Sequence, residues 1–385
     1  MNIVFRPARH CGYTTDSMSD PTKILVVQPN WVGDAVMATP TLRAIRELYP
    51  SAHISYLMRR YVKQLYSGMP WADQIITHRT GRTHTKTGKS LLDLSGRLRA
   101  AKFDLAVLLP NSFKSALICK MAMIPRVVGY ERDGRGFLLT DKLLHVKDRG
   151  KFIPSPIIKT YMGLAHYLGS ASRDLRMQLF VTESDKRGAG QVLARCGLSS
   201  ELSRPGSTGE SPLVLLNPGA QYGAAKCWRP EYFAELADRL IDEQGATVLI
   251  SGTPREKVII ESVKRCMRHA ALDISNKGMT LGSLKEIVRR CDLMVTNDTG
   301  PRHIAAAFDV PVVTVFGPTY PEWTEINFEK ERKVAVKVFC GPCQKKICPL
   351  DHRCMTRVTP AMVYEQALAL LGRSSATPNS LPVVN

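Results

Sequence analysis

Residues 23–34 read Lys23-Ile-Leu-Val-Val-Gln-Pro-Asn-Trp-Val-Gly-Asp34, and their pattern indicates the fold class of the chain. The apolar run at its start is typical of a buried parallel strand, and the Pro, Asn and Gly that follow predict a tight loop. A helical pattern then extends from about residue 34 to residue 49. A strand that leads through a glycine-containing loop into a helix is the first part of a βαβ unit.

The same alternation of strand and helix continues along the chain and is interrupted once, at residues 199–212. Residues 199–212 are rich in Ser, Pro and Gly, which predicts a surface excursion near a domain boundary. Before it we predict strands at residues 53–58, 74–78 and 104–109, an exposed basic loop at 78–89 and a helix at 91–101. After it we predict strands at 213–216, 246–251, 293–296 and 312–316, and helices at 230–243, 255–269 and 301–308.

This order of elements predicts an α/β protein with two doubly wound, Rossmann-like domains that face each other across a cleft. We expect a flexible tail over residues 1–20, an N-terminal domain over 21–180, a C-terminal domain over 181–360, and a final helix with a disordered tail over 361–385. Ligands of such sheets bind at the carboxyl ends of the strands, so candidate site residues are sought there.

The composition is that of a globular protein with a strongly positive charge. Hydrophobic residues make up 44% of the chain and charged residues 23%, which argues against disorder. No apolar run approaches the ~20 residues that cross a bilayer, and the N-terminus lacks the apolar core of a secretory signal, so we expect a cytoplasmic protein. The net charge of +19 favours a polyanionic partner, with surface solubility as the alternative explanation. Basic residues spread along the chain, without a nucleic-acid-binding motif, argue against nucleic acid.

Asp34 is the first candidate site residue. Gly33 permits a sharp turn out of the strand, and Asp34 follows at the start of the predicted helix, where its carboxylate would face the cleft. Two interpretations remain open at this point. The carboxylate could cap the helix by accepting from backbone amides, or it could accept a proton from a reacting hydroxyl. A helix N-terminus stabilises the ionised form and thereby weakens it as a base.

The second candidate site is the loop Asn217-Pro-Gly-Ala-Gln-Tyr-Gly-Ala-Ala-Lys-Cys-Trp-Arg229. Its glycines, Gly219 among them, let backbone N–H groups approach an anion, and Lys226 supplies a positive charge for a phosphate. The chain has neither a Walker A loop nor a dinucleotide-binding Gly-x-Gly-x-x-Gly motif, which argues against ATP hydrolysis and NAD binding. A plain basic surface loop is the alternative.

The third candidate site is the turn Val295-Thr-Asn-Asp-Thr-Gly-Pro-Arg-His303. An apolar strand leads into Asp298, Thr299 and Gly300, and Pro301 is expected at the first helical position. The exposed N–H groups at such a helix start form an anion site suited to a diphosphate. Asp298 and His303 could then bracket the sugar or the phosphate, whereas the alternative is a Thr-capped helix with a surface histidine.

Two observations bear on metal ions. The chain has no Asp-x-Asp pair of the kind that binds Mg²⁺ with a nucleotide sugar. A leaving diphosphate would therefore be neutralised by Lys226 and helix N-termini, and we expect no metal in the reaction and no cofactor. Four cysteines, with His352 among them, are clustered near the C-terminus: Cys340, Cys343, Cys348 and Cys354. A zinc site, packed reduced thiols and a redox-sensitive pair all remain open for this cluster.

Five motifs follow one another along residues 23–371. They are Trp31-Val-Gly-Asp34, Leu109-Pro-Asn-Ser-Phe-Lys-Ser-Ala-Leu117, Pro218-Gly-Ala220 with Gly223 and Ala225-Lys226 ahead of Trp228, Thr296-Asn-Asp-Thr-Gly300 with His303, and Phe316-Gly-Pro-Thr319. This set resembles the glycosyltransferase family of ADP-heptose:lipopolysaccharide heptosyltransferases, glycosyltransferase family 9, and most closely its heptosyltransferase II branch.

The resemblance implies a GT-B fold and an inverting transfer of heptose from ADP-L-glycero-β-D-manno-heptose to the heptosyl-Kdo₂-lipid A inner core, without an obligatory metal. It implies Asp34 as the general base. It also implies a donor site with the diphosphate held by Lys226, Gly219, Thr299 and Gly300 and the heptose lined by Asp298 and His303. Asn111, Ser112 and Lys114 would lie on the acceptor side. The acceptor would be presented at the cytoplasmic face of the inner membrane, whose anionic lipids would attract the positive charge.

Two features depart from the family pattern. The turn Gly300-Pro-Arg-His303 has a Pro-Arg pair where other members often carry an apolar residue, and the segment before Lys23 has no recognised counterpart. Two rival functions are kept. One is another heptosyltransferase, such as I or III, that uses a different acceptor. The other is a non-catalytic protein that binds anionic glycolipid through its basic surface.

Overall fold

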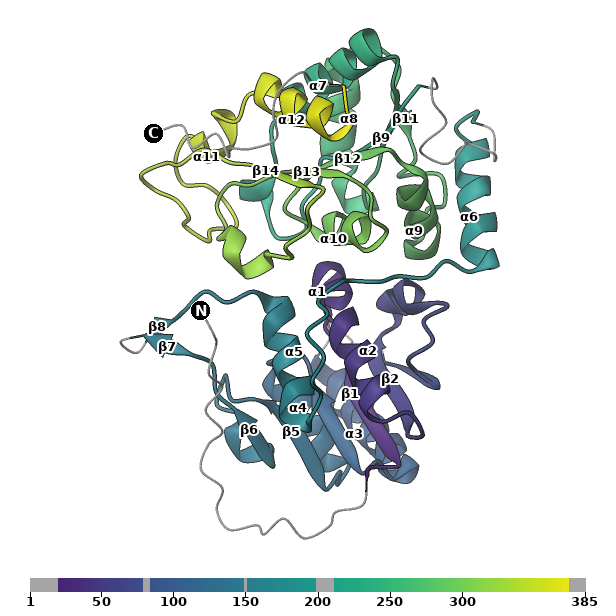
Figure 1. The fold of residues 1–385 in the computed structure, drawn as a ribbon, viewed down its shortest axis with the longest axis vertical. Helices are drawn as coiled ribbons and strands as arrows, with labels where there is room; N and C mark the ends of the chain where they lie inside the picture. The colour runs from purple at the N-terminus through teal and green to yellow at the C-terminus, as the bar shows by residue number, and fades with distance from the viewer. Residues whose placement is uncertain (1–19, 79–83, 149–150, 199–210, 374–385) are drawn as a thin grey trace. The chain divides into compact units, whose positions relative to one another are not determined.

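The structure is a computed structural model that describes residues 20–78, 84–148, 151–198 and 211–373. The chain forms two compact units, which Figure 1 traces from the N-terminus to the C-terminus. The first contains the described residues up to Met177 together with Glu322–Ile326, and the second contains Gln178–Pro321 and the described residues from Asn327 onward. The tails predicted at both ends fall largely on residues 1–19 and 374–385, outside the described residues.

The first unit is built on a six-stranded parallel sheet in the order β3-β2-β1-β4-β5-β6. Its strands are β1 (Lys23–Val27), β2 (His53–Arg59), β3 (Gln74–His78), β4 (Leu105–Leu108), β5 (Arg126–Tyr130) and β6 (Asp141–Leu143). The order reverses between β1 and β4. In doubly wound sheets, ligands bind beyond the carboxyl ends of the two strands at such a reversal.

Helices cover both faces of this sheet (Figure 1). On one face α1 (Val32–Met37), α2 (Thr39–Leu48) and α5 (Ile157–Leu168) pack together, and on the other α3 (His84–Ala101) packs on α4 (Phe113–Met121). Successive side chains of β1 point to opposite faces of the sheet, and Leu25 belongs to the core under α3 and α4. The 3-10 helices η1 (Arg60–Tyr66) and η2 (Gly136–Leu138) and the hairpin β7 (Lys147–Asp148) and β8 (Lys151–Phe152) complete the unit.

The second unit repeats this topology with the order β11-β10-β9-β12-β13-β14, again parallel. Its strands are β9 (Leu213–Asn217), β10 (Thr247–Ile250), β11 (Leu272–Asp273), β12 (Leu293–Asn297), β13 (Val312–Val315) and β14 (Glu331–Val334). The order here reverses between β9 and β12, so the carboxyl ends of these two strands are the expected ligand-binding positions.

The helices of the second unit also form two layers (Figure 1). One layer consists of α7 (Pro230–Gln244), α8 (Lys257–Cys266) and α12 (Pro360–Leu370), which share a core with Leu216, Trp228 and Phe233. The other consists of α6 (Glu183–Ala194), α9 (Leu281–Arg290) and α10 (Gly300–Ala307). The short elements are η3 (Ala224–Lys226), η4 (Pro254–Glu256), η5 (Pro321–Thr324) and α11 (Arg353–Thr356). None of the helices in the described ranges is long and apolar enough to span a bilayer.

The predicted fold class is confirmed by two parallel sheets with helices on both faces. Two local predictions are wrong. Residues 84–89 belong to α3 and not to a basic loop, because hydrophobic periodicity reports packing and misses helical turns that lack an apolar stripe; residues 79–83 lie outside the described residues. The helix predicted over residues 34–49 begins at Val32 and divides at Ala38. Pro40 explains the division, because proline is tolerated in the first turn of a helix but not in its interior.

Candidate active site

Lys226 ends the 3-10 helix η3, in the loop that follows β9 at the reversal of the second sheet. Two glycines of this loop lie too close to neighbouring atoms to carry a side chain. A Cβ on Gly219 would overlap the carboxylate of Glu256, and a Cβ on Gly223 would overlap the backbone oxygen of Lys346. The glycines predicted to favour anion binding are thus also required by the packing of the loop.

Asn297, the last residue of β12, holds this loop against the strand. Its Oδ1 accepts a hydrogen bond from the backbone N–H of Trp228 at 3.0 Å, and its Nδ2 donates to the carbonyl of Pro218 at 2.8 Å. The side chain is completely buried. Sequence reasoning passed over Asn297, although an amide at the end of a predicted strand and directly before Asp298 was a usable signal.

Lys226 and Asp298 form a buried ion pair. The Nζ of Lys226 donates to Oδ2 of Asp298 at 2.6 Å and to its backbone oxygen at 3.1 Å. The side chains are 11% and 3% exposed, so the alternative of a plain surface loop around Lys226 is wrong. The ammonium also lies 5.1 Å from the ring centre of Tyr222. The two predicted donor residues, from segments 72 residues apart, are therefore in direct contact.

Asp298 is ionised throughout the physiological pH range. Burial by itself would raise the pKa of its carboxyl, but the charges of Lys226 and Arg302 and the hydrogen bond from Lys226 lower that pKa to about 2. The hydroxyl of Thr319 also donates to Oδ2, at 3.0 Å. The carboxylate is thus held from the loop after β9, from α10 and from the segment after β13.

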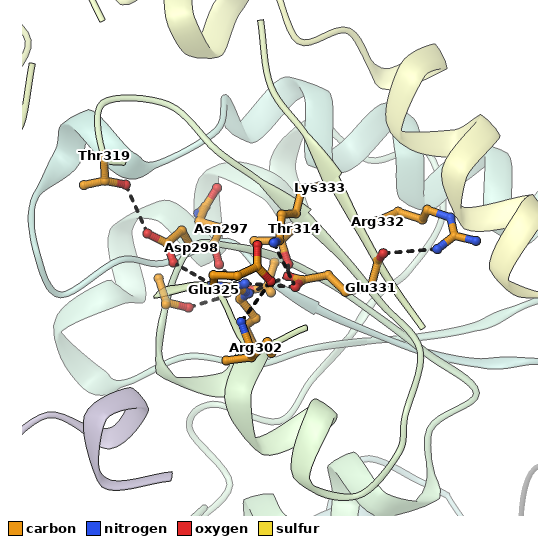
Figure 2. Close-up of polar contacts among 12 residues, drawn as sticks. Asn297, Asp298, Arg302, Thr314, Thr319, Glu325, Glu331, Arg332 and Lys333 are labelled. Carbon is orange, nitrogen blue, oxygen red and sulfur yellow. Dashed lines mark hydrogen bonds and ion pairs between the residues drawn. The ribbon is translucent and has the colours of Figure 1, made fainter. Parts of the chain in front are cut away.

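Arg302 extends this contact into a row of buried charges, which Figure 2 shows. Its Nη1 lies 3.3 Å from Oδ1 of Asp298, and its Nε and Nη2 donate to the two carboxylate oxygens of Glu331, the latter at 2.9 Å. The Arg302 side chain is fully buried and that of Glu331 is 2% exposed. The sequence marks Arg302 only as a departure from the family pattern, and no sequence pattern singles out Glu331.

The first turn of α10 presents backbone N–H groups next to this row. Helix α10 begins at Gly300, one residue earlier than predicted, with Thr299 in extended conformation at its N-cap. Within the described chain the Thr299 hydroxyl caps no amide of the first turn, so the alternative of a Thr-capped helix is wrong. Instead the hydroxyl contacts that of Thr296 at 3.2 Å. Uncapped N–H groups at a helix start are available to an anion.

His303 lies in the first half of α10, where its side chain is buried and neutral. It is 2% exposed, so the alternative of a surface histidine is wrong. Burial, supported by the nearby charge of Arg302, lowers the pKa of its imidazole to about 3. Its Nδ1 has no hydrogen-bond partner among the described residues.

Asp34 occupies the first turn of α1, after β1 at the reversal of the first sheet. The N-cap residue of α1 is Trp31, so the interpretation of Asp34 as the N-cap is wrong. The side chain of Asp34 is half-buried. Its charge acts on a buried neighbour, since burial and then the carboxylate of Asp34 raise the pKa of the Tyr161 hydroxyl. Asp34 therefore lies at the position where a ligand of this unit is expected.

The predicted acceptor residues follow β4, the other strand at this reversal. Ser112 caps α4, with its Oγ accepting from the N–H of Ser115 at 3.3 Å. Asn111 accepts through Oδ1 from Nη2 of Arg135 at 3.2 Å. Lys114 is half-buried on the first turn of α4, and after burial and Arg59 its charge is a further cause of the lowered pKa of His78. Two of the three residues thus shape the loop itself.

The cysteine-containing segment near the C-terminus braces the Lys226 loop. The Tyr222 hydroxyl donates to the backbone oxygen of Gln344 at 2.6 Å, and the Ala225 N–H donates to that of Lys346 at 3.0 Å. Cys340, Cys343, Cys348 and Cys354 carry free thiols, and burial and then the neighbouring thiols raise the pKa of Cys354 to about 11. No group of three or more His, Cys, Asp or Glu in the described part of the chain is arranged to hold a metal ion.

Comparison with known proteins identifies the family. The family model "Glycosyltransferase family 9 (heptosyltransferase)" matches residues 91–353, well over half of the chain. The chain belongs to glycosyltransferase family 9. It is therefore a glycosyltransferase, as its motifs predict.

Relatives within family 9 match over nearly their whole length. The chain is 31% identical to lipopolysaccharide heptosyltransferase 2 of Salmonella typhimurium, over 91% of this chain and 98% of that protein. It is 30% identical to the enzyme of the same name from Escherichia coli, over 92% and 100%. A solved structure of ADP-heptose lps heptosyltransferase II from E. coli superposes with a TM-score of 0.72 at 28% identity, covering 92% and 100% of the two chains. The predicted resemblance to the heptosyltransferase II branch is confirmed.

Proposed function

We propose that this family 9 enzyme transfers heptose from ADP-heptose to the heptosyl-Kdo₂-lipid A inner core of lipopolysaccharide. The observation that carries the proposal is the match, over nearly the full length of both chains, to enzymes named lipopolysaccharide heptosyltransferase 2. A heptosyltransferase I from Pseudomonas aeruginosa matches at 22% identity over 91% of this chain, which favours the II branch over the I branch.

The diphosphate of the donor binds at the carboxyl ends of β9 and β12 in this proposal. Lys226 supplies a positive charge there, and the uncapped N–H groups at Gly300 and the loop at Gly219 supply backbone donors. Thr299 lies at the same helix start. These groups neutralise the charge that develops on the leaving ADP as the bond to the sugar breaks.

Asp298 and His303 lie along the donor heptose in the same proposal. The Asp298 carboxylate keeps its charge because cations surround it, so it can accept hydrogen bonds from sugar hydroxyls. The imidazole of His303 is neutral, so it can pair with a hydroxyl without adding charge. Together they orient the sugar while Lys226 acts on the phosphates.

Asp34 acts as the general base. The acceptor hydroxyl oxygen forms a bond to the anomeric carbon on the face opposite to ADP, and the bond between that carbon and the diphosphate oxygen breaks with its electrons going to ADP. The hydroxyl proton passes to the carboxylate of Asp34. Because a helix N-terminus favours the ionised form, the proton is transferred late, once the attacking oxygen has become acidic. The configuration at the anomeric carbon is inverted.

The acceptor binds the loop after β4, at Asn111, Ser112 and Lys114. The phosphates of lipid A and the carboxylates of Kdo are anionic, and the chain carries a net charge of +19. We include in the proposal a peripheral contact with the anionic cytoplasmic face of the inner membrane, which the same positive charge supports. Flotation with vesicles that contain or lack anionic lipid tests this contact, and equal binding to both would argue against it.

One assay tests the proposed reaction. Purified enzyme is incubated with ADP-, GDP- or UDP-sugars as donors and with Kdo₂-lipid A that carries no heptose or one heptose as acceptor. The products are identified by mass spectrometry. We expect the mass of one heptose to be added from ADP-heptose to the acceptor that already carries one. Transfer to the acceptor without heptose would favour heptosyltransferase I activity. Binding of the acceptor without any transfer would favour the non-catalytic glycolipid-binding protein.

A further inference from the structure

Arg302 carries a buried charge next to Asp298, and its contacts show how that charge is accommodated. The guanidinium is fully buried between two carboxylates, with Nη1 3.3 Å from Oδ1 of Asp298 and Nη2 2.9 Å from Oε2 of Glu331. It also lies 5.0 Å from the ring centre of Phe316. An isolated charge in such a place is strongly destabilising, so carboxylates beside it are what allow this arginine to be there.

Glu331 fixes the guanidinium from the side opposite Asp298 (Figure 2). Two of the nitrogens of Arg302 donate to the two oxygens of this carboxylate, which is the bidentate geometry that holds a guanidinium in one orientation. The Thr314 hydroxyl donates to Glu331 Oε1 at 2.7 Å, and Lys333 lies 3.9 Å from Oε2. Arg302 is therefore anchored on β14 and is not dependent on Asp298 for its position.

Asp298 is in contact with a lysine and an arginine that are held in different ways. Lys226 has a flexible side chain on a loop and approaches Oδ2, whereas Arg302 is anchored and approaches Oδ1. If Lys226 turned toward a diphosphate without Arg302 in place, the buried carboxylate would lose its closest cation. That loss opposes the movement, because a buried carboxylate without a positive partner is unfavourable.

We propose that Arg302, anchored by Glu331, is a positioning residue that balances the negative charge of the Asp298 carboxylate and thereby frees Lys226 to bind a nucleoside diphosphate. This inference rests on the proposed function, in which Lys226 holds the diphosphate of the donor. The Arg302 side chain is fully buried, so in this proposal it makes no direct contact with the substrate. It acts through Asp298, and its effect is on the binding of the donor and not on the proton transfer at Asp34.

The test uses the double variant R302M/E331Q. It removes one cation and one anion together, so the net charge of the cluster is unchanged, and the amide that replaces the carboxylate of Glu331 can still accept from Thr314. Replacing a buried ion pair by uncharged groups of similar size is often tolerated. We expect the Kd of ADP and the KM of the donor to rise about tenfold, which is the size of one charge-assisted hydrogen bond. The KM of the acceptor should stay the same.

A matched control comes from α9. Arg290 donates to the buried carboxylate of Glu286, which Arg289 also contacts, so R290M likewise removes one of two cations from a buried carboxylate of the same unit. We expect R290M to lower the melting temperature without changing the Kd of ADP. A conservative variant, R302K, keeps a cation next to Asp298 and should restore part of the affinity. If the double variant does not fold, the Kd of ADP for R302K is compared directly with that of the wild-type protein.

The outcomes separate this inference from the proposed function. Binding is measured with ADP, GDP and UDP, and the tightest ligand of the wild-type protein is used for all variants. If that ligand binds R302M/E331Q as tightly as it binds the wild-type protein, Arg302 is only structural and the inference is wrong. If the wild-type protein prefers GDP or UDP, the proposed donor is wrong while the role of Arg302 is still measured. If the wild-type protein binds none of the three nucleoside diphosphates, both the proposed donor and the proposed role of Arg302 are wrong.

Discussion

The ammonium of Lys226 lies 2.6 Å from the carboxylate of Asp298, and both side chains are buried in the second unit. A lysine whose proposed task is to bind phosphate is thus held by a carboxylate from another segment. The pair orients Lys226 at the carboxyl ends of β9 and β12 and avoids the entropy cost of ordering a free lysine when the ligand arrives. Ligand binding then exchanges one anionic partner for another.

Replacing Lys226 by Met should weaken donor binding without unfolding the protein. Asp298 keeps its contacts with Arg302 and Thr319, so the buried carboxylate is not left alone. We expect the Kd of ADP, measured by titration calorimetry, to rise roughly 10- to 100-fold, the range of a charge-assisted hydrogen bond. The control is Lys257→Met, an exposed lysine at the start of α8. Unchanged affinity in Lys226→Met would remove this lysine from the donor site.

His303 should make the stability of the protein depend on pH. Its pKa is about 3 in the folded protein, against an ordinary value of 6.5. The folded state therefore binds fewer protons, and stability that is present above pH 6.5 is lost as the pH falls toward 3. The slope should approach about 1.4 kcal/mol per pH unit at most. Urea unfolding between about pH 7 and about pH 5 should show a shallower slope for His303→Gln than for the wild-type protein; parallel curves would contradict the assignment.

The loop before Lys226 should tolerate a methyl group differently at its two glycines. A Cβ at Gly223 overlaps a backbone oxygen of Lys346, whereas one at Gly219 overlaps the side chain of Glu256, which can move. We expect Gly223→Ala to weaken ADP binding and lower the melting temperature more than Gly219→Ala does. The control is Gly96→Ala in α3, where nothing lies within 4 Å of the new Cβ. There the substitution should stabilise the helix by about 0.5–1 kcal/mol.

The fold was predictable because its central strands are buried on both faces. The strands β1, β9, β12 and β13 are predominantly apolar and buried along nearly their whole length, which is the signature of a parallel sheet covered by helices. Two of the elements that were missed lack this signature. Strand β11 has only two residues, Leu272–Asp273, and α9 contains the buried charges Lys285 and Glu286, which interrupt its apolar pattern.

Only those features of the candidate site that lie within one short segment of sequence were predictable. Lys226 and Asp298 each follow an apolar strand in a glycine-containing turn, so each could be found separately. The pairing of Arg302 with Glu331 joins residues 29 positions apart, and a glutamate at the start of an edge strand is normally solvent-exposed. Only the three-dimensional packing shows that both are buried and that the apparent departure at Arg302 has a partner.

Asp34→Asn should strongly reduce turnover while leaving donor binding intact. Asparagine keeps the size of the side chain but cannot accept the proton of the acceptor hydroxyl. We expect kcat to fall about 100- to 10,000-fold, the usual contribution of a general base, with the Kd of ADP within experimental error of the wild-type value. The control is Asp93→Asn on the exposed surface of α3, which should leave kcat unchanged. Normal turnover in Asp34→Asn would remove this residue from the chemistry.

The buried guanidinium of Arg135 should determine the conformation of the loop after β4, where the acceptor is proposed to bind. The side chain is fully buried, and its Nη1 donates to the backbone oxygens of Pro110 and Ser112 at 2.5 and 3.2 Å while Nη2 donates to Asn111. Burial lowers the pKa of Arg135 to about 10, so it remains charged at neutral pH. The loop that follows β4 is thus folded around one cation.

Replacing Arg135 by Lys should separate the charge from the geometry. An ammonium preserves the charge but cannot make the same set of hydrogen bonds at once, so the partly buried carbonyls of Pro110 and Ser112 are no longer both satisfied. Each bond that is not replaced costs about 0.5–1.5 kcal/mol. We expect the KM of the acceptor to rise about tenfold or more while the KM of the donor and the Kd of ADP stay constant. Arg126→Lys is the control, because Arg126 pairs with Asp141 on the neighbouring strand β6 and contacts none of the loop residues named above. A uniform loss of activity with unchanged acceptor KM would show that Arg135 serves only the stability of the unit.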